Sequence, residues 1–180
     1  GGLEKALKAR PAAFMHPARA RLVRVGNLED DLDKLSGCDI VIEAVLEHLD
    51  VKQALFAKLE AVVGPDTIVT SNTSGIPMAI LLKGRSDRFR QRFLGTHFFN
   101  PPRYMHLLEL IPTPDTSSEV LASTRDFAER VLGKGVVIAK DVPGFIANRL
   151  GIYGMTRTLR LMEEFDLTID EVDALTGPLI

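Results

Sequence analysis

Residues 39–45 read DIVIEAV, a nearly continuous apolar run. Such a run is typical of a β-strand that is covered on both faces of a mostly parallel sheet. From Val51 to Val63 the apolar side chains recur at about 3.6-residue spacing, which predicts an amphipathic helix capped by Asp50 and ended by Gly64-Pro65-Asp66. A strand followed by such a helix is half of a βαβ unit, so this stretch indicates an α/β fold.

The same alternation continues toward the C-terminus. Further strands are predicted at residues 67–70, 93–99, 107–111 and 135–139. A short helix is expected from Pro77 to Leu82, and a longer amphipathic helix over residues 120–132, with Thr116 and Glu119 as its capping box. The pattern predicts a Rossmann-type, mostly parallel sheet with helices, and one that is incomplete.

The character of the chain changes at Asp141-Val142-Pro143-Gly144. Only helix is predicted beyond this point, first from about residue 145 to 165 and then after Thr168, which would form a capping box with Glu171. Residues 177–180 (GPLI) read as a turn. We therefore predict an α/β domain over residues 1–140 and the beginning of an all-α C-terminal domain over residues 141–180.

The composition is that of a globular protein with a small net charge. Hydrophobic residues make up 46% of the 180 and charged residues 26%, and a net charge of −2 argues against nucleic acid or an anionic membrane as a partner. We expect no membrane span and no signal peptide, because no apolar run is long enough. Cys38 is the only cysteine, so an internal disulfide is impossible and a zinc site made of cysteines is not expected. A cytoplasmic, reducing location is expected.

Polar residues stand where predicted strands end, which is where open parallel sheets bind ligands. They are Glu43 with Glu47, residues 71–74, residues 97–100, and Glu109. Burying the His97 imidazole without a partner would be costly, and Glu109 on the next strand is available to orient it and favour its protonated form. The pair is thus suited to taking a proton from a hydroxyl group.

Simpler interpretations compete with this one. Taken alone, His97 is a core histidine and Glu109 a surface carboxylate; only their joint position favours catalysis. The other three histidines lack such a setting and are predicted at the surface: His16, His48 and His106. No metal site is predicted, because no pair of histidines has the required spacing.

Several segments occur in the order found in NAD-dependent 3-hydroxyacyl-CoA dehydrogenases. They are residues 70–74 (TSNTS), 95–101 (GTHFFNP), 107–111 (LLELI) and 141–149 (DVPGFIANR), together with residues 41–45 (VIEAV), Glu47 and Lys52. From about residue 22 onward the chain resembles an internal fragment of this family, of a long bacterial form. Four motifs in register are far more specific than any one of them.

The resemblance implies an oxidoreductase of fatty-acid β-oxidation that converts 3-hydroxyacyl-CoA to 3-ketoacyl-CoA by hydride transfer to NAD. His97 would be the general base and Glu109 its partner, while Ser74 and Asn148 would hydrogen-bond around the reacting oxygen. Cofactor contacts are implied for Ala44, Glu47, Lys52, Ser74 and Asn100. Residues 1–140 would be part of an NAD-binding domain, and residues 141–180 would begin a helical domain for substrate binding and dimerisation.

The chain also departs from the family pattern. It contains no G-x-G-x-x-G turn, so the resemblance implies that this turn lies upstream and that the fragment alone is inactive. The parent protein could be a homodimer or be fused to an enoyl-CoA hydratase module. Two other functions stay open: a related NAD-dependent dehydrogenase of another small hydroxy acid, and a non-catalytic dinucleotide-binding module. Lys52 could equally be an ordinary helix-surface ion-pair partner.

Overall fold

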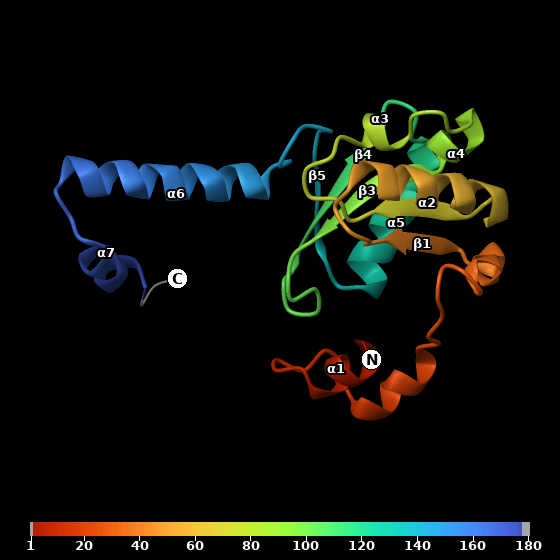
Figure 1. The fold of residues 1–180 in the computed structure, drawn as a ribbon, viewed down its shortest axis with the longest axis horizontal. Helices are drawn as coiled ribbons and strands as arrows, with labels where there is room; N and C mark the ends of the chain where they lie inside the picture. Colours follow the sequence, from red (N-terminus) through yellow and green to blue (C-terminus); the bar gives the residue numbers. More distant parts are fainter. Residues whose placement is uncertain (1, 178–180) are drawn as a thin grey trace. The chain divides into compact units, whose positions relative to one another are not determined.

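A computed structural model describes residues 2–177 of the chain. The chain divides into two compact units, with the division between Pro143 and Gly144, and each unit is described by itself (Figure 1). Within the described residues, no helix is long and apolar enough to cross a membrane. Most of the turn predicted at residues 177–180 lies outside the described residues.

The first unit is built on one five-stranded sheet. Its strands are β1 (Ile40–Glu43), β2 (Ile68–Ser71), β3 (Phe93–Phe98), β4 (Leu107–Pro112) and β5 (Gly135–Ile138). They lie in the order of the sequence, and every neighbouring pair is parallel except β3 with β4. The predicted Rossmann-type, mostly parallel sheet is thus confirmed, and each predicted strand is present.

Helical segments precede the first strand and connect the others. In the first unit they are α1 (Gly2–Lys8), η1 (Pro17–Leu22), η2 (Leu32–Gly37), α2 (Leu49–Val62), α3 (Met78–Leu81), α4 (Asp87–Gln91), α5 (Ser118–Asp126) and the π-helical turn η3 (Phe127–Val131). The second unit consists of α6 (Ala147–Glu164) and α7 (Ile169–Thr176). The two predicted C-terminal helices are present, and Thr168 and Glu171 form the expected capping box at the start of α7.

Side chains alternate between the two faces of the sheet, so each face has its own core. On the α5 face, Leu94, Leu108 and Leu110 pack with residues of α5 and η3. On the α2 face, the rings of Phe56 and Phe93 meet edge to face at a centroid distance of 5.2 Å, and Phe89 of α4 completes the cluster. Figure 1 shows α5 passing behind the sheet, with α2 in front. The α2 face is the one that carries the candidate site.

Strand β1 is less buried than the sequence predicts. Its run was expected to be covered on both faces, but Ile42 is 42% exposed and only Glu43 is buried. In the described chain β1 is the first strand of the sheet, and α5 packs over β3 and β4 rather than over β1. The expectation was therefore wrong for the α5 face of this strand.

The predicted start of α2 is also wrong by two residues. Asp50 was expected to cap this helix, but the N-cap position is held by His48, which makes no side-chain cap bond. Asp50 lies inside the first turn of α2, where its negative charge interacts favourably with the helix dipole.

The capping box predicted for α5 is wrong as well. The N-cap is Ser117, whose side chain accepts a hydrogen bond from the Val120 amide. The Thr116 hydroxyl instead donates to the carbonyl oxygen of Phe93 at 2.6 Å. Serine is a somewhat better N-cap than threonine, and the contact of Thr116 with β3 also favours Ser117 as the cap.

Gly95 brings β3 close to α3. A Cβ at this position would lie 2.3 Å from Met78 Cε and 3.1 Å from two carbons of the Ile111 side chain. Met78 and Ile111 are fully buried, so neither can move away freely. We predict that Gly95→Ala lowers the free energy of unfolding by about 1–3 kcal/mol.

The check is the midpoint of thermal unfolding of the full-length protein. Gly37→Ala is a suitable control, because nothing lies within 4 Å of a Cβ added there. Equal midpoints for Gly95→Ala and Gly37→Ala would show that β3 and α3 are not tightly packed.

Candidate active site

His97 and Glu109 are directly opposite one another in the antiparallel pair β3–β4. Opposite residues of such a pair put their side chains on the same face, so the register alone brings the imidazole to the carboxylate. His97 is 4% exposed and Glu109 1% exposed, and Nδ1 of the imidazole lies 2.8 Å from Oε2 of the carboxylate. The predicted pairing is confirmed as geometry.

This contact determines how the imidazole can react. A carboxylate oxygen only accepts hydrogen bonds, so the ring proton is on Nδ1 and the basic lone pair is on Nε2. Phe99 packs edge to face against the ring at a centroid distance of 4.5 Å, which restrains its rotation. When Nε2 takes up a proton, the adjacent Glu109 carboxylate stabilises the resulting cation. The arrangement is that of a general base with a carboxylate partner.

The turns after β1 and β2 lie beside this pair in the sheet. Strands β1, β2 and β3 are parallel, so their carboxyl ends lie at one edge. Asn72 lies directly after β2. Its side-chain oxygen accepts a hydrogen bond from the backbone amide of Phe98 at 2.9 Å, and its backbone amide donates to the carbonyl oxygen of Glu43 at 2.8 Å. Asn72 thereby joins the ends of all three strands. In the sequence Asn72 is only one residue of a polar turn.

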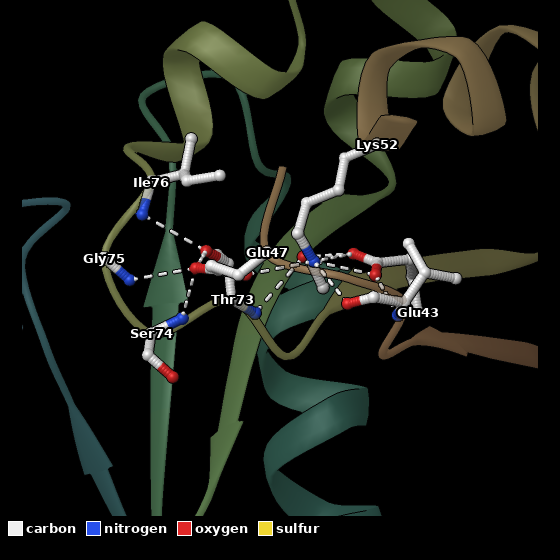
Figure 2. Close-up of polar contacts among 9 residues, drawn as sticks. Glu43, Glu47, Lys52, Thr73, Ser74, Gly75 and Ile76 are labelled. Carbon is white, nitrogen blue, oxygen red and sulfur yellow. Dashed lines mark hydrogen bonds and ion pairs between the residues drawn. The ribbon is translucent and has the colours of Figure 1, made fainter. Parts of the chain in front are cut away.

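Glu47 holds the turn that contains Ser74. Its Oε1 accepts hydrogen bonds from the Thr73 hydroxyl, from the Ser74 amide at 2.9 Å and from the Gly75 amide at 3.3 Å (Figure 2). Partial burial raises the pKa of the Glu47 carboxyl, but the hydrogen bonds from Thr73 and Ser74 and the Lys52 ammonium outweigh that effect and lower it. Glu47 is therefore an anion at neutral pH, with a side chain that is 43% exposed.

Lys52 is not a surface helix residue. It is 1% exposed, and its ammonium lies 2.8 Å and 3.0 Å from the two carboxylate oxygens of Glu43 and 3.2 Å from Oε2 of Glu47. Figure 2 shows this ammonium between the two carboxylates. The alternative of an ordinary helix-surface partner is thus wrong for Lys52. Glu43, in the sequence only a polar residue at a strand end, is thus a further member of the site.

The other predicted site residues lie at the positions that the strands dictate. Ala44 follows β1, Ser74 follows β2 and Asn100 follows β3, and all three are exposed. Asn148 is the second residue of α6 in the second unit and is half-buried. The three remaining histidines are exposed, as predicted: His16, His48 and His106.

Known proteins share this chain's sequence over most of its length. The family model described as "3-hydroxyacyl-CoA dehydrogenase, NAD binding domain" matches residues 3–142. A probable 3-hydroxyacyl-CoA dehydrogenase of Deinococcus radiodurans is 58% identical over 179 residues, which cover 99% of this chain and 52% of that protein. A putative fatty acid oxidation complex trifunctional enzyme of Rickettsia felis is 42% identical over 146 residues, 81% of this chain and 20% of that protein.

Solved structures are similar as well. The crystal structure of M. tuberculosis FadB2 matches with a TM-score of 0.80 and 37% sequence identity, over 95% of this chain and 59% of that one. The chain thus spans about half the length of the Deinococcus relative and a smaller share of the Rickettsia protein.

Proposed function

The chain belongs to the 3-hydroxyacyl-CoA dehydrogenase family, and we propose that the full-length protein oxidises 3-hydroxyacyl-CoA to 3-ketoacyl-CoA with NAD in fatty-acid β-oxidation. The observation that carries the proposal is the buried contact between His97 and Glu109, because this oxidation needs a base for the hydroxyl proton. The names of the similar proteins agree with this chemistry.

In the proposed mechanism, Nε2 of His97 removes the proton from the substrate hydroxyl. NAD, when bound, would supply the acceptor for the hydride that leaves the carbon bearing this hydroxyl. Glu109 keeps the ring in the orientation and tautomer that present Nε2, and it stabilises the imidazolium that forms. Ser74 would donate a hydrogen bond to the reacting oxygen. Such donors stabilise the charge that develops on this oxygen in the transition state.

The cofactor would be held by residues at the carboxyl ends of the parallel strands. The half-exposed Glu47 carboxylate suits a ribose hydroxyl, which donates hydrogen bonds to an anion. Ala44, Ser74 and Asn100 are exposed at the same edge of the sheet and are further proposed contacts. Lys52, whose ammonium lies 3.2 Å from Oε2 of Glu47, is the remaining proposed contact. The phosphate-binding glycine turn is not among these 180 residues, so the cofactor site is to be tested in the full-length protein.

The proposal extends to the setting of the enzyme. The proposal allows two forms of assembly: a homodimer, and a chain fused to an enoyl-CoA hydratase module. The match to a protein named as a putative trifunctional enzyme of a fatty acid oxidation complex supports the second form. We place the protein in the cytoplasm, where reducing conditions suit a chain whose single cysteine, Cys38, is a free thiol.

The direct test is an assay of the reverse reaction with acetoacetyl-CoA. The purified full-length protein should oxidise NADH when this substrate is added, and NADPH should replace NADH poorly. A panel of small keto acids without coenzyme A serves as the control. Turnover of one of those acids in place of acetoacetyl-CoA would identify a dehydrogenase of another hydroxy acid. Tight NADH binding with no turnover of any substrate would indicate a non-catalytic dinucleotide-binding module.

A further inference from the structure

The Glu43 carboxylate has no place in the mechanism above, yet it is one of the best-connected groups in the chain. Its side chain is 0% exposed. It accepts hydrogen bonds from the Lys52 ammonium at 2.8 Å and 3.0 Å, from the Ser71 hydroxyl at 2.6 Å and from the Val45 amide at 2.6 Å. Because no part of this side chain is exposed, its effect on a ligand must pass through these partners.

Stability alone does not account for a charge pair at this position. Burying a carboxylate and an ammonium costs a large desolvation free energy, and apolar residues of similar size often serve stability as well or better. What a fully hydrogen-bonded ion pair does supply is fixed geometry. Each of the donors around Glu43 occupies a set direction, so the atoms that carry them are held relative to one another.

Two of these donors lie at the turns that carry the proposed cofactor contacts. Val45 lies in the turn after β1, next to Ala44, and Ser71 ends β2 just before the turn with Ser74. The Ser71 hydroxyl also accepts a hydrogen bond from the Thr73 amide at 3.3 Å. Glu43 therefore links the two turns through the half-buried Val45 amide and the buried Ser71 hydroxyl.

A second connection runs through Lys52. An ammonium has three N–H groups, and at this site they face the two oxygens of Glu43 and one oxygen of Glu47. Glu47 in turn accepts the Ser74 and Gly75 amides (Figure 2). Without the Glu43 anion, the ammonium would keep one oxygen of Glu47 and the Val45 carbonyl oxygen at 3.5 Å, and Glu47 would lose a fixed counter-charge.

We infer that Glu43 is a positioning residue for cofactor binding. It acts through Lys52 and Ser71 to hold the Glu47 carboxylate and the Ser74 turn at a fixed separation. This inference rests on the proposed function, because Glu47 and Ser74 are proposed cofactor contacts. Glu43 thus determines the affinity for NAD without touching it and leaves the His97–Glu109 pair unaffected.

The test compares wild type with Glu43→Gln in the full-length protein. Glutamine keeps the shape but removes the charge that holds Lys52. We expect the dissociation constant of NADH, followed by its fluorescence, to rise about tenfold or more, as for a lost hydrogen bond to a charged group. The KM for NADH should rise in parallel, while kcat and its pH profile stay as in wild type. In the ligand-free protein, hydrogen exchange at the Ser74 and Gly75 amides should become faster.

A second variant covers the case in which Glu43→Gln does not fold. Thr73→Val keeps every charge but removes the hydroxyl that donates to Glu47, so it should raise the NADH dissociation constant and speed the same amide exchange. The matched control is Thr70→Val. It removes the buried hydrogen bond between the Thr96 and Thr70 hydroxyls at 2.8 Å, three residues away and outside this network, and should leave NADH affinity unchanged.

Unchanged NADH affinity and amide exchange in a folded Glu43→Gln would overturn the inference. If that variant fails to fold, wild-type behaviour of Thr73→Val would overturn it equally. A lower kcat with a shifted pH profile and an unchanged KM would also contradict it, because Glu43 would then act on the base. Failure of the proposed function is a separate result: wild type would not turn over acetoacetyl-CoA, whereas the exchange experiment needs no substrate.

Discussion

In the full-length protein, His97→Gln should lower kcat for acetoacetyl-CoA reduction by about 10²–10⁴-fold, the usual contribution of a positioned general acid or base. Glutamine is similar in size to histidine and its amide can still donate to the Glu109 carboxylate, so the buried contact of 2.8 Å has a replacement. The amide cannot exchange a proton with the substrate oxygen near neutral pH. The KM values for substrate and NADH should change little, because the loss is confined to the chemical step.

The control for this prediction is His106→Gln. His106 is exposed in the connection between β3 and β4, and its replacement should leave kcat unchanged. Circular dichroism and the thermal midpoint should show that both variants are folded. A folded His97→Gln with wild-type kcat would mean that another group takes the proton.

Glu109→Gln should lower kcat by a comparable factor, about 10²–10⁴-fold. A neutral amide no longer stabilises the imidazolium, and it can present its NH₂ group to Nδ1, which favours the tautomer that has its proton on Nε2. The variant should therefore be slow even at the pH at which the wild-type rate is highest. The effect should fall on kcat, while the KM values for substrate and NADH change little.

The measurement is kcat for wild type and Glu109→Gln, with the thermal midpoint as a control for folding. A rate within about threefold of wild type would show that Glu109 is merely a buried structural carboxylate. The combination with His97→Gln is informative as well. If the two residues act as one unit, the double variant should be no slower than the slower single variant.

Much of the fold could be predicted from the sequence, because apolar periodicity is a local property. The runs at residues 39–45 and 93–99 are both present as strands, β1 and β3, in a mostly parallel sheet. The pair of His97 and Glu109 was predictable too. Two strands joined by a short connection with two prolines are neighbours, and a buried imidazole needs a partner.

What the sequence could not supply depends on contacts between distant residues. The cap of α5 is Ser117 and not Thr116, because Thr116 bonds to β3. Ile42 is half exposed, because the burial of an apolar strand depends on which helix covers it. Local propensities contain no information on which strand lies next to a residue or on which strands a helix covers.

The network around Lys52 is the clearest such case. In the sequence it is a lysine near acidic residues, and a surface interpretation is reasonable. In the structure α2 turns its side chain inward to the end of β1, where Glu43 receives it. A useful local signal was present: a carboxylate closes an apolar strand and a lysine follows nine residues later in the next helix. Such a pattern in an α/β chain can be tested in advance for a buried ion pair.

The most direct test is a crystal structure of the full-length protein with NAD and acetoacetyl-CoA bound. We expect the oxygen on C3 of the substrate to lie within hydrogen-bond distance of His97 Nε2, about 2.6–3.2 Å. We also expect the contact between His97 and Glu109 to be unchanged. A substrate oxygen directed at a different side chain, with His97 out of reach and no water between them, would contradict the assignment of His97 as the base.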